Sequence, residues 1–163
     1  MKRLSVVLLA VSVFIAFSQV VEPRVKEGYW SVHIQITNNP GNIKQETSES
    51  ICRSHAYDQY ANQQTKTRKG CKVISEKAAA NTYTLELECN SNGSVVKNKS
   101  TTTYTGDTAF RRESHSISTP PQRGVSESTV ITEERYAGSC PAGSQPGDIT
   151  RPDGSKFNNY NKK

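Results

Sequence analysis

Apolar and polar residues alternate strictly in the stretch YWSVHIQIT, residues 29–37. After Tyr29, its apolar side chains fall on one face of an extended chain: Trp30, Val32, Ile34 and Ile36. A repeat of two residues is the period of a β-strand, so this stretch predicts a strand with one buried face. The next residues, NNPGN, are typical of a turn, because proline fixes φ and glycine accepts a positive φ.

Further strand patterns follow at regular spacing and predict an antiparallel meander. In TYTLELEC, one face carries Tyr83, Leu85, Leu87 and Cys89. This stretch forms the clearest hairpin with GCKVISEK before it. A parallel sheet would require a helix after nearly every strand, and the sequence mostly offers turn residues instead. We expect further strands at residues 43–51, 97–104, 109–117 and 125–136, with a loop at 118–124.

One segment departs from the two-residue pattern and predicts a helix. Ser54 is a suitable N-cap, because its hydroxyl can accept a hydrogen bond from the first helical turn. Residues with apolar side chains follow at helical spacing: Ala56, Tyr57, Tyr60 and Ala61. The expected fold is therefore mainly β, an antiparallel meander that forms a curved sheet or partial barrel with one short inserted helix.

The N-terminus has the pattern of a secretory signal peptide. Two basic residues precede an uncharged, mostly apolar run at residues 4–17, which is shorter than the roughly 20 residues of a membrane span. The small side chain of Ser18 favours cleavage after it. The mature chain is therefore expected in the periplasm or outside the cell, without a transmembrane anchor. The expected divisions are a signal peptide at 1–18, one β-rich domain at 19–157 and a flexible polar tail at 158–163.

The four cysteines all lie in the exported part of the chain, where disulfides are expected. None belongs to a CxxC pair, which argues against a structural zinc site and a thioredoxin-like motif. Because only 33% of the residues are apolar, the domain needs such cross-links. We expect Cys52 to pair with Cys71 and Cys89 with Cys140. The second arrangement, Cys71 with Cys89 and Cys52 with Cys140, follows if a hairpin is centred on residue 80.

Charge adds little to this interpretation. Without the two basic residues of the signal peptide, 19 basic side chains remain against 15 acidic ones, a net charge of about +4. The densest basic cluster, KTRKGCK, has no aromatic residues that could stack on bases, so we expect a solvated loop and no nucleic-acid partner. An alternative is electrostatic docking to an anionic envelope surface. The residues for such docking are Lys66, Arg68, Lys69 and Lys72.

No group of residues predicts catalysis. The three histidines lie in different predicted elements, and no GxSxG turn for a serine nucleophile occurs. Each candidate carboxylate lies beside a glycine in a turn, where aspartate is favoured for hydrogen bonding to the backbone. The sequence therefore assigns no catalytic, cofactor-binding or metal-binding residue and favours a protein that is not an enzyme. The residues concerned are His33, His55, His115, Asp107, Asp148 and Asp153.

Several landmarks together resemble a known family. They are EGYW near the mature start, Cys52 before the helix, GCKV, YTGD and YAGSCPAGSQPGDITRPDG. The chain resembles a family of small exported bacterial proteins known as domain of unknown function 3617. Members carry a Gly-Leu-Trp-like element, where this chain has Gly28, Tyr29 and Trp30. The resemblance implies bacterial export and a four-cysteine domain, and it implies no activity.

The sequence favours a non-catalytic envelope protein that binds a small apolar ligand or an envelope protein on a concave sheet face. Candidate lining residues are Trp30, Tyr83 and Phe110, and the alternative for each is that it fills the core. A second hypothesis is a hydrolase that acts on envelope material through His115 and the carboxylates of Asp107 and Asp148. The third is the electrostatic docking described above.

Overall fold

The computed structural model describes residues 21–160, so the predicted signal peptide at 1–18 and the last three residues lie outside the described part. Most of the described chain is β-strand, and one helix follows the second strand. The elements are β1 (Gly28–Asn39), β2 (Ile43–Arg53), α1 (His55–Lys66), β3 (Cys71–Ala79), β4 (Thr82–Ser91), β5 (Ser94–Thr105), β6 (Ala109–Gln122), β7 (Val125–Gly138), β8 (Asp148–Thr150) and β9 (Lys156–Asn158).

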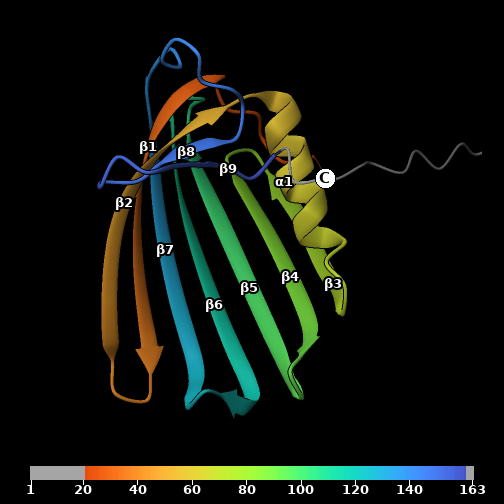
Figure 1. Cartoon of the computed structure of the whole chain (residues 1–163). Helices are drawn as coiled ribbons and strands as arrows, with labels where there is room; N and C mark the ends of the chain where they lie inside the picture. Colours follow the sequence, from red (N-terminus) through yellow and green to blue (C-terminus); the bar gives the residue numbers. More distant parts are fainter. Residues whose placement is uncertain (1–20, 161–163) are drawn as a thin grey trace, which may run out of the picture.

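All nine strands form a single antiparallel sheet in the order β3-β4-β5-β6-β7-β1-β2-β8-β9. Five consecutive strands make a meander from β3 to β7, and β1 then pairs with β7 on one side and β2 on the other. The sheet is strongly curved (Figure 1) and stays open, with β3 and β9 at its two edges. The predicted fold class, a curved antiparallel meander with one inserted helix, is confirmed.

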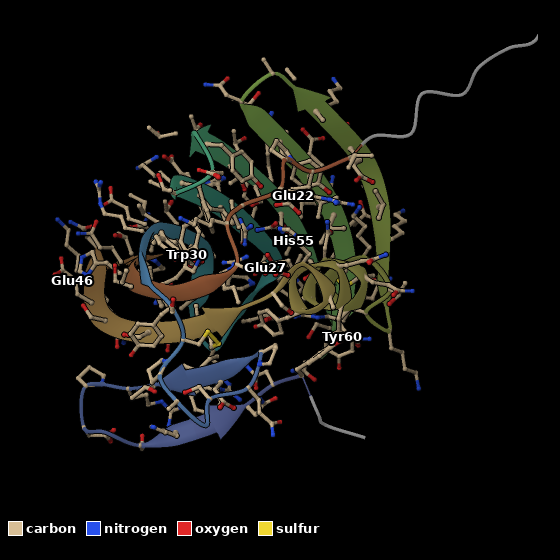
Figure 2. The ribbon with its side chains drawn as sticks, turned by 90° about the horizontal axis from the view of Figure 1, so that it is seen from above. Glu22, Glu27, Trp30, Glu46, His55 and Tyr60 are labelled. Atoms are coloured by element: carbon tan, nitrogen blue, oxygen red, sulfur yellow. A yellow bond between two sulfur atoms is a disulfide. The ribbon has the colours of Figure 1, made fainter. Side chains whose placement is uncertain are left out.

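Helix α1 lies on the concave side of the sheet and contacts the edge strand β3 (Figure 2). Its start follows the predicted capping pattern, because the Ser54 hydroxyl accepts a hydrogen bond from the backbone N–H of Tyr57 at 3.1 Å. At the other end, the hydroxyl and the backbone N–H of Thr67 both donate to the Gln63 carbonyl. The helix therefore begins where the Ser54 hydroxyl replaces a missing backbone partner, and it ends at Thr67, whose hydroxyl adds a second hydrogen bond to the last turn.

The core lies inside the curve of the sheet, beneath the start of α1. The predicted alternation holds in the first half of β1, where Trp30 and Val32 are buried, whereas Ile34 and Ile36 are half-buried like their polar neighbours. Trp30 is fully buried and packs against Phe110 and Tyr136, with ring centroids 5.9 and 6.0 Å apart, and its indole N–H donates to the Lys26 carbonyl. Aromatic rings that meet at such angles stabilise a core beyond their buried area. The aromatic cluster fixes the upper end of the sheet around β1.

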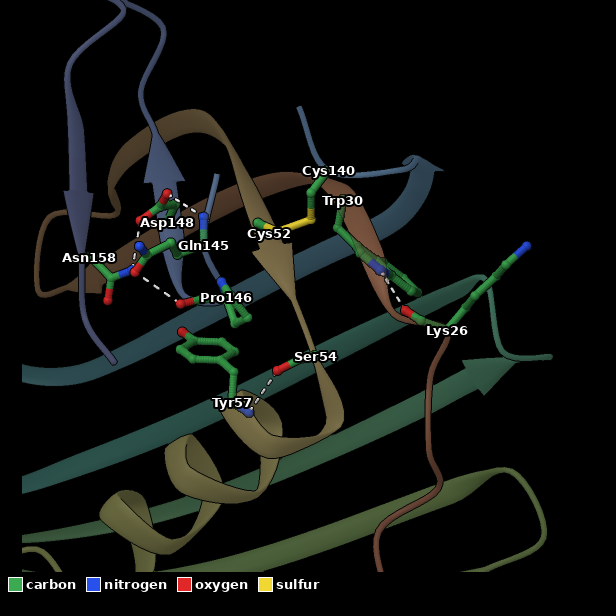
Figure 3. Close-up of a disulfide and its surroundings, with 10 residues drawn as sticks. All are labelled: Lys26, Trp30, Cys52, Ser54, Tyr57, Cys140, Gln145, Pro146, Asp148 and Asn158. Carbon is green, nitrogen blue, oxygen red and sulfur yellow. Dashed lines mark hydrogen bonds between the residues drawn. A yellow bond between two sulfur atoms is a disulfide. The ribbon is translucent and has the colours of Figure 1, made fainter. Parts of the chain in front are cut away.

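The disulfides correct the first sequence expectation. Cys52 is bonded to Cys140, and Cys71 to Cys89, which is the arrangement that a hairpin centred on residue 80 required. The register of β3 and β4 is the physical reason, because it sets Cys71 directly opposite Cys89. The remaining pair joins the end of β2 to the segment after β7 (Figure 3).

Two further segments differ from expectation. The stretch at 118–124 is largely strand, because β6 continues to Gln122 and only a short turn precedes β7. The pairing of β6 with β7 shifts register between Ile117 and Gln122, and this irregularity accommodates prolines that cannot donate to the ladder. The predicted strands end at residue 136, yet β8 and β9 form a short hairpin that extends the sheet beyond β2.

The end of the described chain packs onto the helix. The Tyr160 ring lies 5.8 Å from Tyr57 and 5.1 Å from Tyr60 between ring centroids. Gly147 makes this approach feasible, since its φ is +86° and an added Cβ would lie 2.7 Å from the Cβ of Tyr160. Tyr160, which belongs to the predicted polar tail at 158–163, therefore contacts the first turns of α1.

The N-cap gives a direct test of how α1 is held. Replacing Ser54 with alanine removes the acceptor for the Tyr57 N–H and is expected to lower the free energy of unfolding by about 1 kcal/mol. Urea denaturation followed by far-ultraviolet circular dichroism measures the loss. Ser54→Asp, which keeps an acceptor, is the matched control. An alanine variant as stable as the wild type would show that the cap does not contribute.

Candidate ligand-binding site

A cavity of about 470 Å³ lies between the concave face of the sheet and α1. Strands β4, β5 and β6 form its floor, α1 forms one side, and the segment from Val21 to Val25 crosses over it before β1 begins. Figure 2 shows Glu22 of this segment inside the curve of the sheet. Pockets that hold small molecules have roughly 300–1,000 Å³, so this cavity is large enough for one.

The lining of the cavity has two chemical halves. One half is apolar and comes mainly from β4, with an aromatic ring from β6: Tyr83, Leu85, Leu87 and Phe110. The other half is polar and comes from β5 and β6: Asn98, Ser100, Thr102, Arg112 and Ser114. The division follows the strand sequences, since TYTLELEC places aliphatic residues on the inner face of β4 while KNKSTTTY places amide and hydroxyl groups on that of β5. An amphipathic molecule fits such a lining.

The first turn of α1 is held over the cavity by a buried ion-pair network. The Arg53 guanidinium donates to Asp58, with its Nη2 2.8 Å from Oδ1, and to Glu134 of β7. Burial disfavours the charge on Arg53, but Glu134 and Asp58 outweigh it and raise the pKa of Arg53. Burial also raises the pKa of Asp58, although Arg53 opposes this shift. Because both carboxylates already neutralise Arg53, this arginine is not available to an anionic ligand.

The last turn of α1 is held by a second network at the β3 edge. Lys66 Nζ lies 2.5 Å from Glu76 Oε1, and the Tyr83 hydroxyl donates to the same oxygen at 2.8 Å. Burial favours the neutral form of Glu76, but hydrogen bonds from Lys66 and Tyr83 outweigh it and lower the pKa of this carboxyl. The helix is therefore anchored at both ends, to β7 and to β3, and covers the space between them.

Inside the cavity, side chains of α1, β5 and β6 bind Glu22 of the segment that crosses over it. The carboxylate of Glu22 accepts hydrogen bonds on both oxygens: Oε1 from the Tyr104 hydroxyl at 2.5 Å and Oε2 from Asn62 Nδ2 at 2.8 Å. Arg112 Nη2 lies 3.4 Å from Oε1. Burial, together with the charge and hydrogen bond of Glu22, raises the pKa of Tyr104. The Tyr104 hydroxyl is therefore protonated and acts as a donor.

The predicted lining residues are placed as follows. Tyr83 and Phe110 lie in the cavity wall, whereas Trp30 belongs to the core beside it. All three are nearly or fully buried. Their contact with a ligand stays a prediction.

The residues named for a hydrolase lie on three separate elements. Asp107 is in the turn between β5 and β6, His115 is exposed on β6, and Asp148 begins β8. The backbone N–H of Gln145 and the side chain of Asn158 donate to Asp148 (Figure 3) and lower its pKa. A hydrogen bond from Ser155 likewise lowers the pKa of Asp153. The structure does not join these groups into one site.

The other two histidines and the basic cluster do not form a common site either. His33 contacts the Ser48 hydroxyl, and His55 contacts the Val25 carbonyl. Within residues 21–160, no three His, Cys, Asp or Glu side chains are grouped so that they could hold a metal ion. In the basic cluster, Lys66 pairs with Glu76 and Lys72 with Glu88, so half of its charges already have a carboxylate partner. No helix in the described part of the chain is long and apolar enough to cross a membrane.

The residues that shape the site most could not be predicted from the sequence. Arg53, Glu22 and Arg112 were not singled out, because each meets its partners only through the sheet topology: Arg53 is 81 residues from Glu134, and Glu22 is 82 residues from Tyr104. One signal was available. Arg112 lies on the same strand face as Phe110, and a cation in that position on a half-buried strand requires a partner.

A family model described as "Protein of unknown function (DUF3617)" matches residues 25–140. The chain belongs to this family. The expectation from the sequence landmarks is thereby confirmed. The match extends from Val25, in the wall of the cavity, to Cys140, so the DUF3617 region includes both disulfides and all the strands that form the cavity floor.

Comparison with solved structures found a distant likeness to an S-type phycobiliprotein lyase, CPES, from Guillardia theta. The sequences are 9% identical, the TM-score is 0.37, and the match covers 69% of this chain and 89% of the lyase. No curated protein matches the chain. Membership of the DUF3617 family is therefore the relationship on which the assignment rests.

Proposed function

We propose that this protein is an exported, non-catalytic binding protein that holds a small amphipathic molecule in the cavity beneath α1. The observation that carries the proposal is the cavity of about 470 Å³, whose lining is apolar on β4 and mainly polar on β5 and β6. The helix that covers it is anchored at both ends, through Asp58 and through Lys66, so the cavity belongs to the folded state. The two disulfides support export, since such bonds persist in oxidising compartments.

The test is binding of the neutral fluorescent probe N-phenyl-naphthylamine to the purified mature protein. An apolar probe that enters the cavity leaves water, so its fluorescence is expected to rise in a saturable way. Mass spectrometry of a solvent extract of freshly purified protein then looks for a retained amphipathic molecule. An absence of both saturable binding and a retained molecule would contradict the proposal.

Cavity-filling variants connect the binding to this site. Leu85→Trp adds volume on the apolar wall and is expected to lower the probe affinity about tenfold or more. Ser100→Phe narrows the same cavity from β5 and provides an independent test if Leu85→Trp fails to fold. Lys97→Trp, which places the same indole at an exposed position on β5, is the matched control. If all three variants bound the probe with the same affinity, the probe would bind outside this cavity.

A further inference from the structure

Three hydrogen-bond donors from different elements converge on one carboxylate within the cavity. They come from α1, β5 and β6, and the carboxylate belongs to Glu22 of the crossing segment. We name this group the carboxylate cradle and define it as Asn62, Tyr104 and Arg112.

The cradle is held in place independently of Glu22. The buried Thr102 hydroxyl accepts a hydrogen bond from Arg112 Nε at 2.9 Å, which aims the guanidinium into the cavity. The Phe110 ring lies 5.5 Å from the Arg112 Cζ atom and supports its flat face. Tyr104 is itself buried, at the upper end of β5. The donors are therefore set by the sheet and the helix, while Glu22 is delivered by a segment that precedes the first strand.

The geometry suits a carboxylate in particular. One oxygen of Glu22 takes the phenol and the guanidinium, and the other takes the side-chain amide. A protonated phenol, a guanidinium and an amide N–H are all donors, so the three groups that face Glu22 suit an ionised acceptor better than a neutral alcohol, whose own hydroxyl also needs an acceptor. Hydrogen bonds to an ionised acceptor are about twice as strong as those between neutral groups.

The apolar wall continues away from the cradle in one direction. Leu85 and Leu87 lie opposite Ser100 and Asn98, four and six residues along β5 from Tyr104. Arg112 lies opposite Thr102, two and four residues from the same positions. At roughly 3.3 Å per residue, the leucines are about 7 to 13 Å from Arg112 and about 13 to 20 Å from Tyr104 along the strand. A headgroup in the cradle would therefore place an extended hydrocarbon tail along the leucines of β4.

We propose that the carboxylate cradle binds the headgroup of an amphipathic carboxylic acid, and that Glu22 is its internal competitor. This inference rests on the proposed function and specifies the ligand class for the same cavity. A tethered carboxylate acts at an effective concentration on the order of millimolar. A ligand must displace Glu22 to reach the cradle, so the wild-type protein binds such acids more weakly than a variant without this side chain.

The experiment compares dodecanoate with dodecanol as competitors of bound N-phenyl-naphthylamine in the full mature chain. In Glu22→Ala, dodecanoate is expected to compete about tenfold better than in the wild type, and about tenfold better than dodecanol. Combining Glu22→Ala with Tyr104→Phe and Arg112→Met is expected to remove the preference for the acid. Dodecanol has the same chain length as dodecanoate and no charge, so a change in its competition reports a change in cavity volume and not in charge recognition.

Control variants separate charge recognition from loss of structure. Arg111→Met removes an exposed arginine on the neighbouring position of β6, where Glu113 is its partner, and is expected to leave the preference unchanged. Arg112→Lys keeps the positive charge and is expected to retain part of the preference. Probe binding with equal competition by dodecanoate and dodecanol in Glu22→Ala would overturn this inference and leave the proposed function intact. Absence of binding by the probe and both competitors would overturn both.

Discussion

Arg53→Met is expected to lower the free energy of unfolding by about 3–5 kcal/mol, because it leaves the buried carboxylate of Glu134 and the partly buried one of Asp58 without their cation. The side chains of Arg53 and Glu134 are only 13% and 9% exposed, and Asp58 completes the network. The guanidinium also lies 5.2 Å from the Phe110 ring centroid, so its loss removes packing as well as charge. Urea denaturation at neutral pH measures the change.

The pH dependence of this variant distinguishes the charge effect from lost packing. Burial raises the pKa of Asp58 even with Arg53 present, and removing Arg53 is expected to raise it further. A carboxyl whose pKa is higher in the folded state destabilises the protein as pH rises through its unfolded value, near 4. The deficit of Arg53→Met is therefore expected to shrink as pH falls from 7 toward 4. A deficit that stays constant over this range would assign the loss to packing.

Arg111→Met is the matched control, since Arg111 pairs with Glu113 at 46% and 51% exposure of the two side chains. Exposed ion pairs contribute about 0 to 1 kcal/mol, so this variant is expected to remain close to the wild type. If Arg53→Met were as stable as Arg111→Met and the wild type, the ion-pair network would not anchor the first turn of α1.

Removal of the Cys52–Cys140 bond by alanine at both positions is expected to cost about 4 to 5 kcal/mol in the chain-entropy model. The bond joins residues 88 positions apart, whereas Cys71 and Cys89 are 18 apart. Removal of the shorter cross-link is expected to cost about 3 kcal/mol, because a smaller loop constrains the unfolded chain less. Small domains have a total stability of roughly 5 to 15 kcal/mol, so the first variant is close to unfolding.

Urea denaturation of the two double variants, each with its remaining disulfide intact, makes the comparison. Peptide mapping under non-reducing conditions verifies the pairing in the wild type. A greater loss from the Cys71–Cys89 variant would contradict the entropic ordering. Peptides that link Cys52 to Cys71 would contradict the pairing itself.

Local patterns in the sequence were sufficient for the helix and most of the strands, but they missed β8, β9 and the end of β6, and they were insufficient for the site. The alternation around Trp30 and the N-cap at Ser54 were readable because a strand face and a helix start depend on neighbouring residues. The disulfide pairing depended on the register of β3 and β4, which the sequence left open between two arrangements. The cavity required the curvature of the whole sheet to bring Glu22 to Tyr104.

The position of β1 in the sheet has a consequence for how the chain folds. β1 is the first strand made, yet it lies between β2 and β7, where Ser31 pairs with Arg135, 104 residues later. The β1–β2 hairpin can form early, but the other hydrogen-bonding edge of β1 has no partner until β7 arrives. Such distant pairing is the slow part of folding a β-protein. A chain translocated N-terminus first would therefore complete its sheet only after nearly all of it has crossed the membrane.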